Sequence, residues 1–291
     1  MMKGKRIRET KPKRLNRSVG GDGLIFLVLC AFGAFMILPF VYTIVQSIKP
    51  LEEIFIFPPR FFWVNNPTIE NFRMLTQLTN NLWVPFGRYV FNSVFVTVVG
   101  SGFHVIVASM AAFVLAKKRF PGSVWIFEMI VLSLLFTGPV TAIPQYIIMA
   151  EMGLIDSYLA VLLPAIGGSL GLFLMKQNMS IIPDAIIDAA EIDGAGTFRI
   201  FWSIAMPVVK PAWMTLIIFA FQSLWNGSGS NLIYDEAKKV LPTVLNQIST
   251  AGISRAGVGA AVAVLLLIPP VGVFIITQSN VLETMAHSGI K

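Results

Sequence analysis

The stretch SIIPDAIIDAAEIDGAGTFRIFWSIAMP, residues 180–207, is polar and amphipathic and lies between two long apolar runs. Asp184, Asp188 and Glu191 fall at positions i, i+4 and i+7, so a helix here would carry three carboxylates on one face. Pro183 suits the first turn of such a helix, and Asp184 places negative charge near its positive end. The pattern therefore predicts a short helix that begins near Pro183.

A glycine turn follows the predicted helix. Gly194 and Gly196 permit backbone angles, or a close approach of another backbone, that a side chain would oppose. A second amphipathic stretch comes after them. A surface of small and acidic residues suits a helix that docks in a partner's groove. A solvated helix at the membrane surface is the alternative that the residues alone leave open.

Six apolar runs make up most of the chain. Of its 291 residues, 55% are hydrophobic and 13% charged; a soluble domain carries about a quarter charged residues. A membrane-crossing helix needs about 20 mostly apolar residues. The fold class predicted is all-α integral membrane protein, with a tail at 1–23, a six-span domain at 24–291 and a loop at 176–208. The predicted spans are about 24–48, 89–116, 123–150, 157–175, 209–227 and 257–277.

Basic residues indicate the orientation. Eight of the 22 Lys and Arg residues lie in the first 17 positions, directly before an apolar run. With the N-terminus inside, the internal segments carry 15 basic residues and the external segments 7. This excess predicts that both termini are cytoplasmic. Because the basic residues cluster before a span, the +7 net charge does not indicate binding to nucleic acid. The single cysteine, Cys30, excludes a disulfide framework and a metal site built from cysteines.

The loop resembles the signature loop of ATP-binding-cassette importer permeases. That signature is Glu-Ala-Ala, three residues, Gly, nine residues, then Ile-x-Leu-Pro. Its counterparts here keep the spacing throughout and are Asp188, Ala189, Ala190, Gly194, Ile204, Met206 and Pro207. Asp188 replaces glutamate and Met206 replaces leucine, both mild changes. Gly138-Pro139 and the 143–146 stretch, Ile-Pro-Gln-Tyr, are similar to the carbohydrate branch, close to the second permease of maltose-type importers.

The resemblance implies a type I importer permease fold with a cytoplasmic coupling helix, in a bacterial plasma membrane. It implies import of a sugar or oligosaccharide by alternating access, with a second permease chain as heterodimer partner, an ATPase dimer and an extracytoplasmic solute-binding protein. The chain has no Gly-x-x-x-x-Gly-Lys-Ser/Thr loop, so ATP and Mg belong to the ATPase and the chain is not an enzyme. The residues that would couple to the ATPase are Asp184, Asp188, Ala189, Ala190, Glu191, Gly194, Ile204 and Pro207.

Polar residues within the spans are candidates for the solute path. Amides and hydroxyls exchange hydrogen bonds with sugar hydroxyls, and a tryptophan face stacks on a sugar ring; helix–helix packing is the alternative. The candidates are Thr137, Thr141, Gln145, Gln222, Trp225 and Asn226. Two ionisable residues also fall within spans. We interpret His104 as a neutral packing residue and Glu128 as a residue within reach of the interface.

Several alternatives remain open at this level. The loop 49–88 is aromatic and proline-rich, which is typical of an interface belt with an amphipathic helix on the membrane, or of a docking surface for an external partner. The same importer could carry a peptide, a polyamine or a phosphodiester. A secondary transporter is less compatible, because the chain lacks midplane acids and pseudo-repeated halves.

Overall fold

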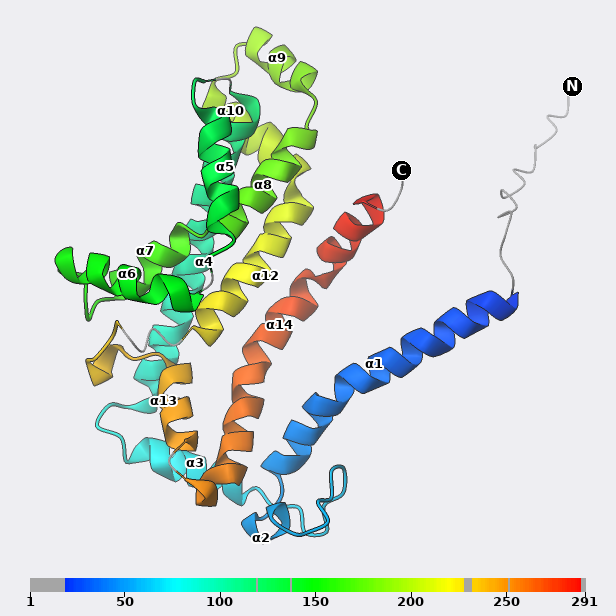
Figure 1. Ribbon diagram of the computed structural model, residues 1–291, viewed down its shortest axis with the longest axis vertical. Helices are drawn as coiled ribbons and strands as arrows, with labels where there is room; N and C mark the ends of the chain where they lie inside the picture. The colour runs from blue at the N-terminus through cyan, green and yellow to red at the C-terminus, as the bar shows by residue number, and fades with distance from the viewer. Residues whose placement is uncertain (1–18, 119, 137, 228–231, 251, 289–291) are drawn as a thin grey trace, which may run out of the picture.

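The computed structural model describes residues 19–118, 120–136, 138–227, 232–250 and 252–288, and the described elements are all helical (Figure 1). Within these residues, four helices are long and apolar enough to cross a membrane, or six if each of two bent pairs is one span. A backbone in hydrocarbon must satisfy its own polar groups, which the helix does. The prediction of an all-α, multi-pass membrane protein is confirmed. Residues 1–18 of the predicted tail lie outside the described residues.

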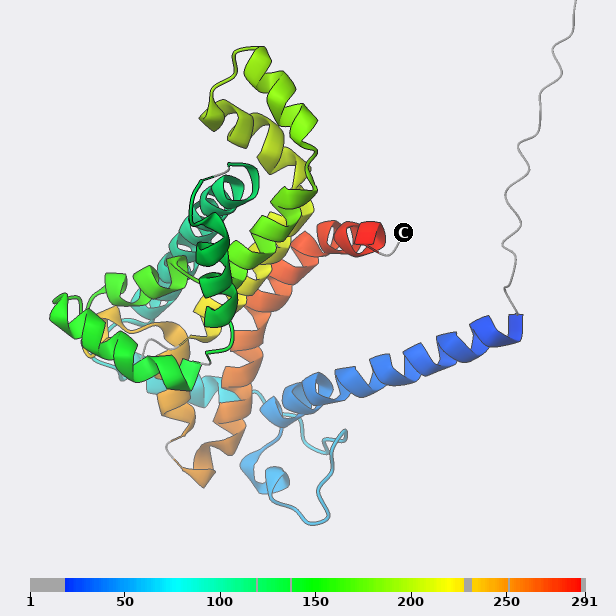
Figure 2. The ribbon, with the colours of Figure 1, turned by 45° about the horizontal axis from the view of Figure 1, so that its top comes forward.

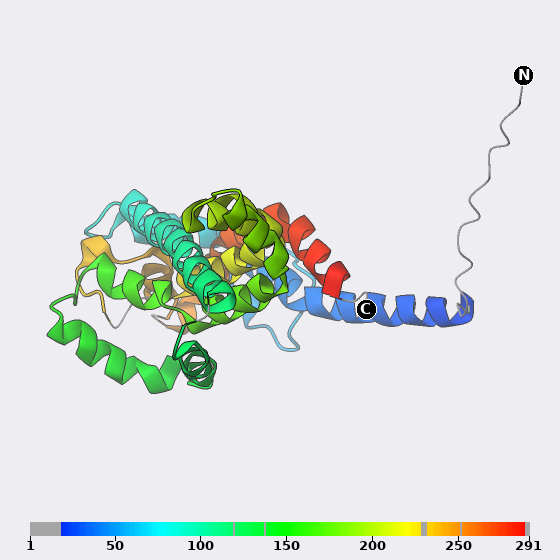
Figure 3. The same ribbon diagram turned by 90° about the horizontal axis from the view of Figure 1, so that it is seen from above.

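The bundle is built around α4 (Phe86–Lys117). It packs against α7 (Tyr158–Ile166), α8 (Ser169–Ile181) and α12 (Lys210–Asn226), and α12 packs against α14 (Ala256–Ser288). The first predicted span is α1 (Val19–Ser47), which contacts α14 near one end and otherwise stands away from the bundle (Figures 1 and 3). The spans predicted at 24–48, 89–116, 157–175 and 257–277 therefore correspond to helical segments of spanning length.

The third predicted span is bent. The run at 123–150 forms α5 (Ser123–Ser133) and α6 (Gly138–Glu151), whose axes differ by 113°. The α-helix ends at Ser133, where the next amides bond three residues back, as in Leu135 N–H to the Leu132 carbonyl. Helix α6 then begins at Gly138, and Pro139 lies in its first turn, where a residue without an N–H loses no helical hydrogen bond. The span predicted at 123–150, with its two internal prolines, therefore corresponds to this bent pair of helices.

The predicted loop at 176–208 is almost entirely helical. Helix α8 runs on to Ile181, beyond the predicted end of the fourth span at 175, and the segments that follow are α9 (Asp184–Ile192), α10 (Thr197–Ile200), a π-helical turn (Phe201–Ala205) and α11 (Met206–Val208). The chain then bends by 83° into α12, the fifth predicted span. Helix α9 projects from one end of the bundle, here called the α9 end (Figure 2).

The opposite end, called the α13 end, carries shorter helices. These are α2 (Leu51–Ile54), α3 (Glu70–Asn80), α13 (Leu241–Ser249) and 3₁₀ turns at Glu236–Lys238 and Ile253–Arg255. Leu75 of α3 is buried against Leu245 of α13 and Val258 of α14. The amphipathic helix expected to lie on the membrane thus buries its apolar face against its own chain.

Candidate functional site

Helix α9 is seated on the bundle by two small apolar contacts. Ile187 and Ala190 are buried and belong to one cluster with Ala112 of α4 and Met179 of α8. The remaining residues of α9 are exposed. Ala190, the second alanine of the signature, therefore packs inward, whereas Ala189 faces outward. The core of the membrane bundle continues without a break into the predicted coupling helix.

Gly194 ends α9 in a conformation that favours glycine. Its φ is +79°, in the left-handed region. The Gly194 N–H donates to the Glu191 carbonyl at 3.0 Å, and the Ala195 N–H donates to the Ala190 carbonyl at 2.9 Å. These two bonds form a Schellman motif, which satisfies the last carbonyls of the helix. Gly196 differs, because its φ of −67° is open to any residue.

Two of the three predicted acids pair with the end of α4. Lys117 Nζ lies 2.8 Å from Asp184 Oδ1, and Lys118 Nζ lies 2.6 Å from Glu191 Oε1. At the sequence level these lysines served only to set the orientation. The pairs could have been predicted from the sequence, because two adjacent lysines end one predicted span and the acidic face of the predicted helix lies on the same side of the membrane.

The face of α9 that points away from the bundle is acidic and apolar. Asp188 is exposed, and within the described part of the chain it has no hydrogen-bond or ion-pair partner. Ile192 is 86% exposed, and Phe198 on α10 is also exposed. A soluble surface rarely leaves such large apolar side chains together without a partner. This face has the composition of a docking surface.

The end of the signature coincides with the 83° corner. Ile204 is half-buried in the π-helical turn and packs on the cluster below α9, and Pro207 is exposed in α11. The Trp213 indole N–H donates to the Met206 carbonyl at 3.1 Å. Proline has no N–H, so a helix that passes Pro207 and then Pro211 loses bonds and turns where they are lost.

The solute-path candidates separate into groups. Thr141 and Gln145 line an open concavity of about 420 Å³ on α6, and Gln222 and Asn226 are exposed on α12. Thr137 lies outside the described residues.

Trp225 does not fit the predicted stacking role. Its side chain is 5% exposed, its ring stacks on Phe221 at 5.9 Å, and its indole N–H donates to the Leu266 carbonyl at 3.0 Å. In this conformation neither ring face is open to a sugar. Trp225 holds α12 against α14, so the burial of its ring depends on the position of α14.

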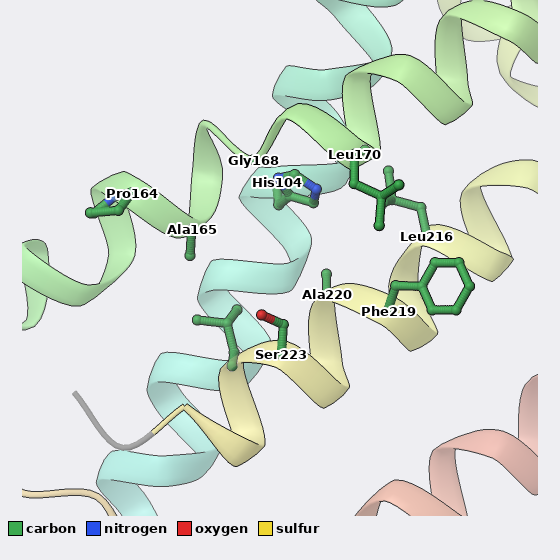
Figure 4. A pocket seen from close by; sticks show the side chains of 11 residues that line it. His104, Pro164, Ala165, Gly168, Leu170, Leu216, Phe219, Ala220 and Ser223 are labelled. Atoms are coloured by element: carbon green, nitrogen blue, oxygen red, sulfur yellow. The ribbon is translucent and has the colours of Figure 1, made fainter. Parts of the chain in front are cut away.

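His104 closes the junction between α7 and α8. Its Nδ1 lies 2.9 Å from the carbonyl oxygen of Ile166, the last residue of α7; because a carbonyl oxygen only accepts, Nδ1 carries the proton and donates. The ring packs on Gly168 and Gly171: a Cβ atom at Gly171 would lie 2.2 Å from His104 Nε2. The same ring lines a cavity of about 210 Å³ between α4, α8 and α12 (Figure 4). This is the packing role predicted for His104.

Glu128 is exposed on α5. Helix α5 is attached to α8 by a hydrogen bond from Ser133 Oγ to Ser169 Oγ at 2.5 Å. Among the described residues, no group of three His, Cys, Asp or Glu side chains could hold a metal ion.

The α13 end contains a cluster of polar contacts outside the spans. Asp156 Oδ1 accepts hydrogen bonds from the backbone N–H groups of Tyr234 and Asp235 at 3.0 and 2.9 Å, and Lys238 Nζ pairs with Asp156 Oδ2 at 3.2 Å. The backbone bond from Asp235 is the largest cause that holds the pKa of Asp156 below its ordinary value. This polar cluster fixes the loop after α12 to the loop before α7.

Comparison with known proteins assigns the chain to a family. Residues 104–283 match the family described as "Binding-protein-dependent transport system inner membrane component". The chain belongs to this family. The match covers more than half of the chain and includes α9, Gly194 and the corner at Pro207. The resemblance to importer permeases is confirmed at the level of the family.

Known proteins are similar to this inner membrane component over most of its length. Protein LplC of Bacillus subtilis (strain 168) is 29% identical over 286 residues, covering 91% of this chain and 92% of the relative. The polygalacturonan/rhamnogalacturonan transport system permease protein YtcP of the same organism is 29% identical over 233 residues, covering 78% and 77%. A chain of a bacterial ABC transporter involved in alginate import has a TM-score of 0.76 at 23% identity, covering 91% and 98%. It shares the fold.

Proposed function

We propose that this chain is a permease subunit of an ATP-binding-cassette importer that moves a sugar or oligosaccharide into the cell. The observation that carries the proposal is α9: a helix seated on the membrane bundle, ended by Gly194 and presenting Asp188 outward, within a binding-protein-dependent family. A carbohydrate is the favoured solute because YtcP, a relative over most of the chain, is named as a carbohydrate permease.

Three kinds of partner complete the machine. A second permease chain closes the pore as a heterodimer, an extracytoplasmic binding protein delivers the solute, and an ATPase dimer binds ATP and Mg. The permease binds no cofactor of its own and hydrolyses nothing. Membership of a binding-protein-dependent family supports the binding protein and argues against a self-sufficient secondary transporter.

The coupling surface is the outward face of α9. Asp188, Ala189 and Ile192 are exposed there, and Ile187 and Ala190 fix the helix to the bundle. A helix moves as a unit when it is packed on one side, so force applied by the ATPase passes to α4 and α8. The solute then crosses as the bundle exchanges inward-facing and outward-facing states.

Uptake into proteoliposomes tests this function. The chain is reconstituted with its second permease, its ATPase and its binding protein. ATP is enclosed inside, and labelled oligosaccharides are supplied with the binding protein outside. We expect uptake that stops when the binding protein or ATP is omitted. Uptake of a peptide, polyamine or phosphodiester, but of no oligosaccharide, would support the proposal of an importer and contradict the proposal that its solute is a sugar.

Variants in the solute path should separate contact from packing. We expect Gln222→Ala and Asn226→Ala to raise the KM for uptake several-fold, since both amides are exposed. Trp225→Phe should instead lower the melting temperature with little change in sugar preference, because it removes the bond to the Leu266 carbonyl. Unchanged KM and preference in both amide variants would make these residues structural.

Cysteine labelling tests the proposed orientation. With Cys30 replaced by alanine, single cysteines are placed at Asp235 and at Asp193, both exposed positions at opposite ends of the bundle. In intact cells we expect a membrane-impermeant maleimide to modify the cysteine at 235 and to spare the one at 193, because the α9 end is cytoplasmic. The reverse pattern would invert the proposed topology.

A further inference from the structure

The ammonium of Lys117 lies where α4, α8 and α9 meet. Lys117 is the last residue of α4, and its side chain is only 3% exposed. Its Nζ donates to the carbonyl of Ile182, the residue that caps α8, and to Asp184 Oδ1 at 2.8 Å, in the first turn of α9. One cation therefore bonds to two other helices.

The two partners lie within a backbone joint and directly after it. Ile182 and Pro183 both have extended backbone angles, with ψ of 125° and 133°, and they separate α8 from α9. Two extended residues would allow α9 to pivot on α8. Lys117 bonds to the carbonyl of Ile182, the first residue of the joint, and to the carboxylate of Asp184 after it, so a side chain of α4 restrains the pivot.

Physical chemistry favours these bonds. A buried ammonium requires partners, because its loss of hydration is costly. The last carbonyls of a helix lack partners within the helix, and the dipole makes that end attractive to a cation. The acid at the start of α9 complements the same cation. Removal of Lys117 would leave the Ile182 carbonyl without this donor.

Lys118 provides the natural comparison. It is adjacent in sequence and also pairs with α9, through Glu191, but the two side chains are 39% and 46% exposed. Water competes for both groups, and exposed pairs contribute little. Among the described residues, Lys118 makes no hydrogen bond to α8.

We propose that Lys117 is the positioning residue that locks the joint between α8 and α9 and passes the displacement of α9 to α4. The inference rests on the proposed function, since it presumes that an ATPase displaces α9. Without Lys117, α9 keeps its outward face and the apolar contacts of Ile187 and Ala190, but its first turn is free to pivot at 182–183, so less of its displacement reaches α4. ATP hydrolysis is then uncoupled from transport: the ATPase hydrolyses ATP while little solute is moved.

The test compares Lys117→Met, Lys117→Arg and Lys118→Met in proteoliposomes that contain the assembled transporter. The readout is solute imported per ATP hydrolysed, measured beside ATPase co-purification. For Lys117→Met we expect co-purification within about twofold of the parent and at least a tenfold loss in solute per ATP. Lys118→Met should change the ratio less than twofold, and Lys117→Arg should restore at least half of it.

Asp184→Ala covers the case in which Lys117→Met does not fold. Asp184 is 73% exposed, so its truncation buries no new group, and it removes the bond to α9 while Lys117 keeps the α8 carbonyl. We expect about a threefold loss in solute per ATP. An unchanged ratio in Lys117→Met, or in Asp184→Ala where Lys117→Met is lost, overturns the proposal. Failure of the parent chain to retain the ATPase overturns the proposed function as well.

Discussion

Gly194→Trp is expected to abolish retention of the ATPase while the membrane bundle stays folded. Gly194 is the residue after the cap of α9, at a φ of +79°, where an L side chain costs about 1–2 kcal/mol. Among the described residues, and apart from the two that adjoin Gly194 in the chain, none has an atom within 4 Å of a Cβ placed there, so the space is open to a partner. An indole would strain the turn and occupy that space.

Two smaller substitutions distinguish backbone strain from steric exclusion of the partner. Asparagine tolerates the left-handed conformation but carries a larger side chain, whereas alanine is small but strained there. If the ATPase approaches Gly194 closely, Gly194→Asn should lose more binding than Gly194→Ala; if only the turn matters, the order reverses. The control is Gly196→Ala, since Gly196 has an ordinary φ and open space.

The measurements are co-purification of the ATPase and hydrolysis stimulated by the loaded binding protein. The melting temperature of each purified variant reports whether the bundle is intact. We expect Gly194→Trp to lose at least 90% of the bound ATPase with a melting temperature near that of the parent. Parent-like binding and stimulation in this variant would show that α9 is not the docking element.

Local pattern was sufficient to predict α9 because its determinants are adjacent in sequence. The acids at i, i+4 and i+7, the proline before them and Gly194 after them specify a helix and its end without help from the rest of the chain. The structure places that helix at Asp184–Ile192. Pro183 proves to be its cap rather than part of its first turn.

The bends could not be read from the sequence, because proline has no fixed outcome in a membrane helix. Pro39 in α1 and the Pro269-Pro270 pair in α14 lie inside continuous helices, whereas the chain breaks just before Pro139. Neighbouring groups decide whether the lost hydrogen bonds are replaced. Those neighbours come from other helices.

Long-range pairings were likewise beyond the sequence pattern. Lys117 and Asp184 are 67 residues apart, and their contact depends on how α4 packs on α8. The burial of Trp225 depends on α14 in the same way, through the Leu266 carbonyl. Residue type gave tryptophan as a sugar-stacking candidate, but only packing determines whether its face is open.

Gly171→Ala is expected to destabilise the bundle strongly, because the new methyl group would collide with His104. Its Cβ would lie 2.2 Å from His104 Nε2 and 2.9 Å from Leu216 Cδ1. The His104 ring is buried and its Nδ1 is bonded to the Ile166 carbonyl, so it cannot rotate away without losing that bond. Overpacking of a core typically costs about 1–3 kcal/mol. The melting temperature of the purified chain measures the loss.

The collision predicts a specific suppressor. His104→Ala removes the ring and makes room for the methyl group, so the double variant Gly171→Ala/His104→Ala should melt higher than Gly171→Ala alone. Such non-additivity is the mark of two residues in direct contact. Gly102→Ala is the matched control on α4, since a Cβ there meets no described atom within 4 Å outside its own stretch of helix, and it should leave the melting temperature unchanged. A double variant whose losses simply add would show that His104 and Gly171 do not form this contact, and the junction between α7 and α8 would then need another support.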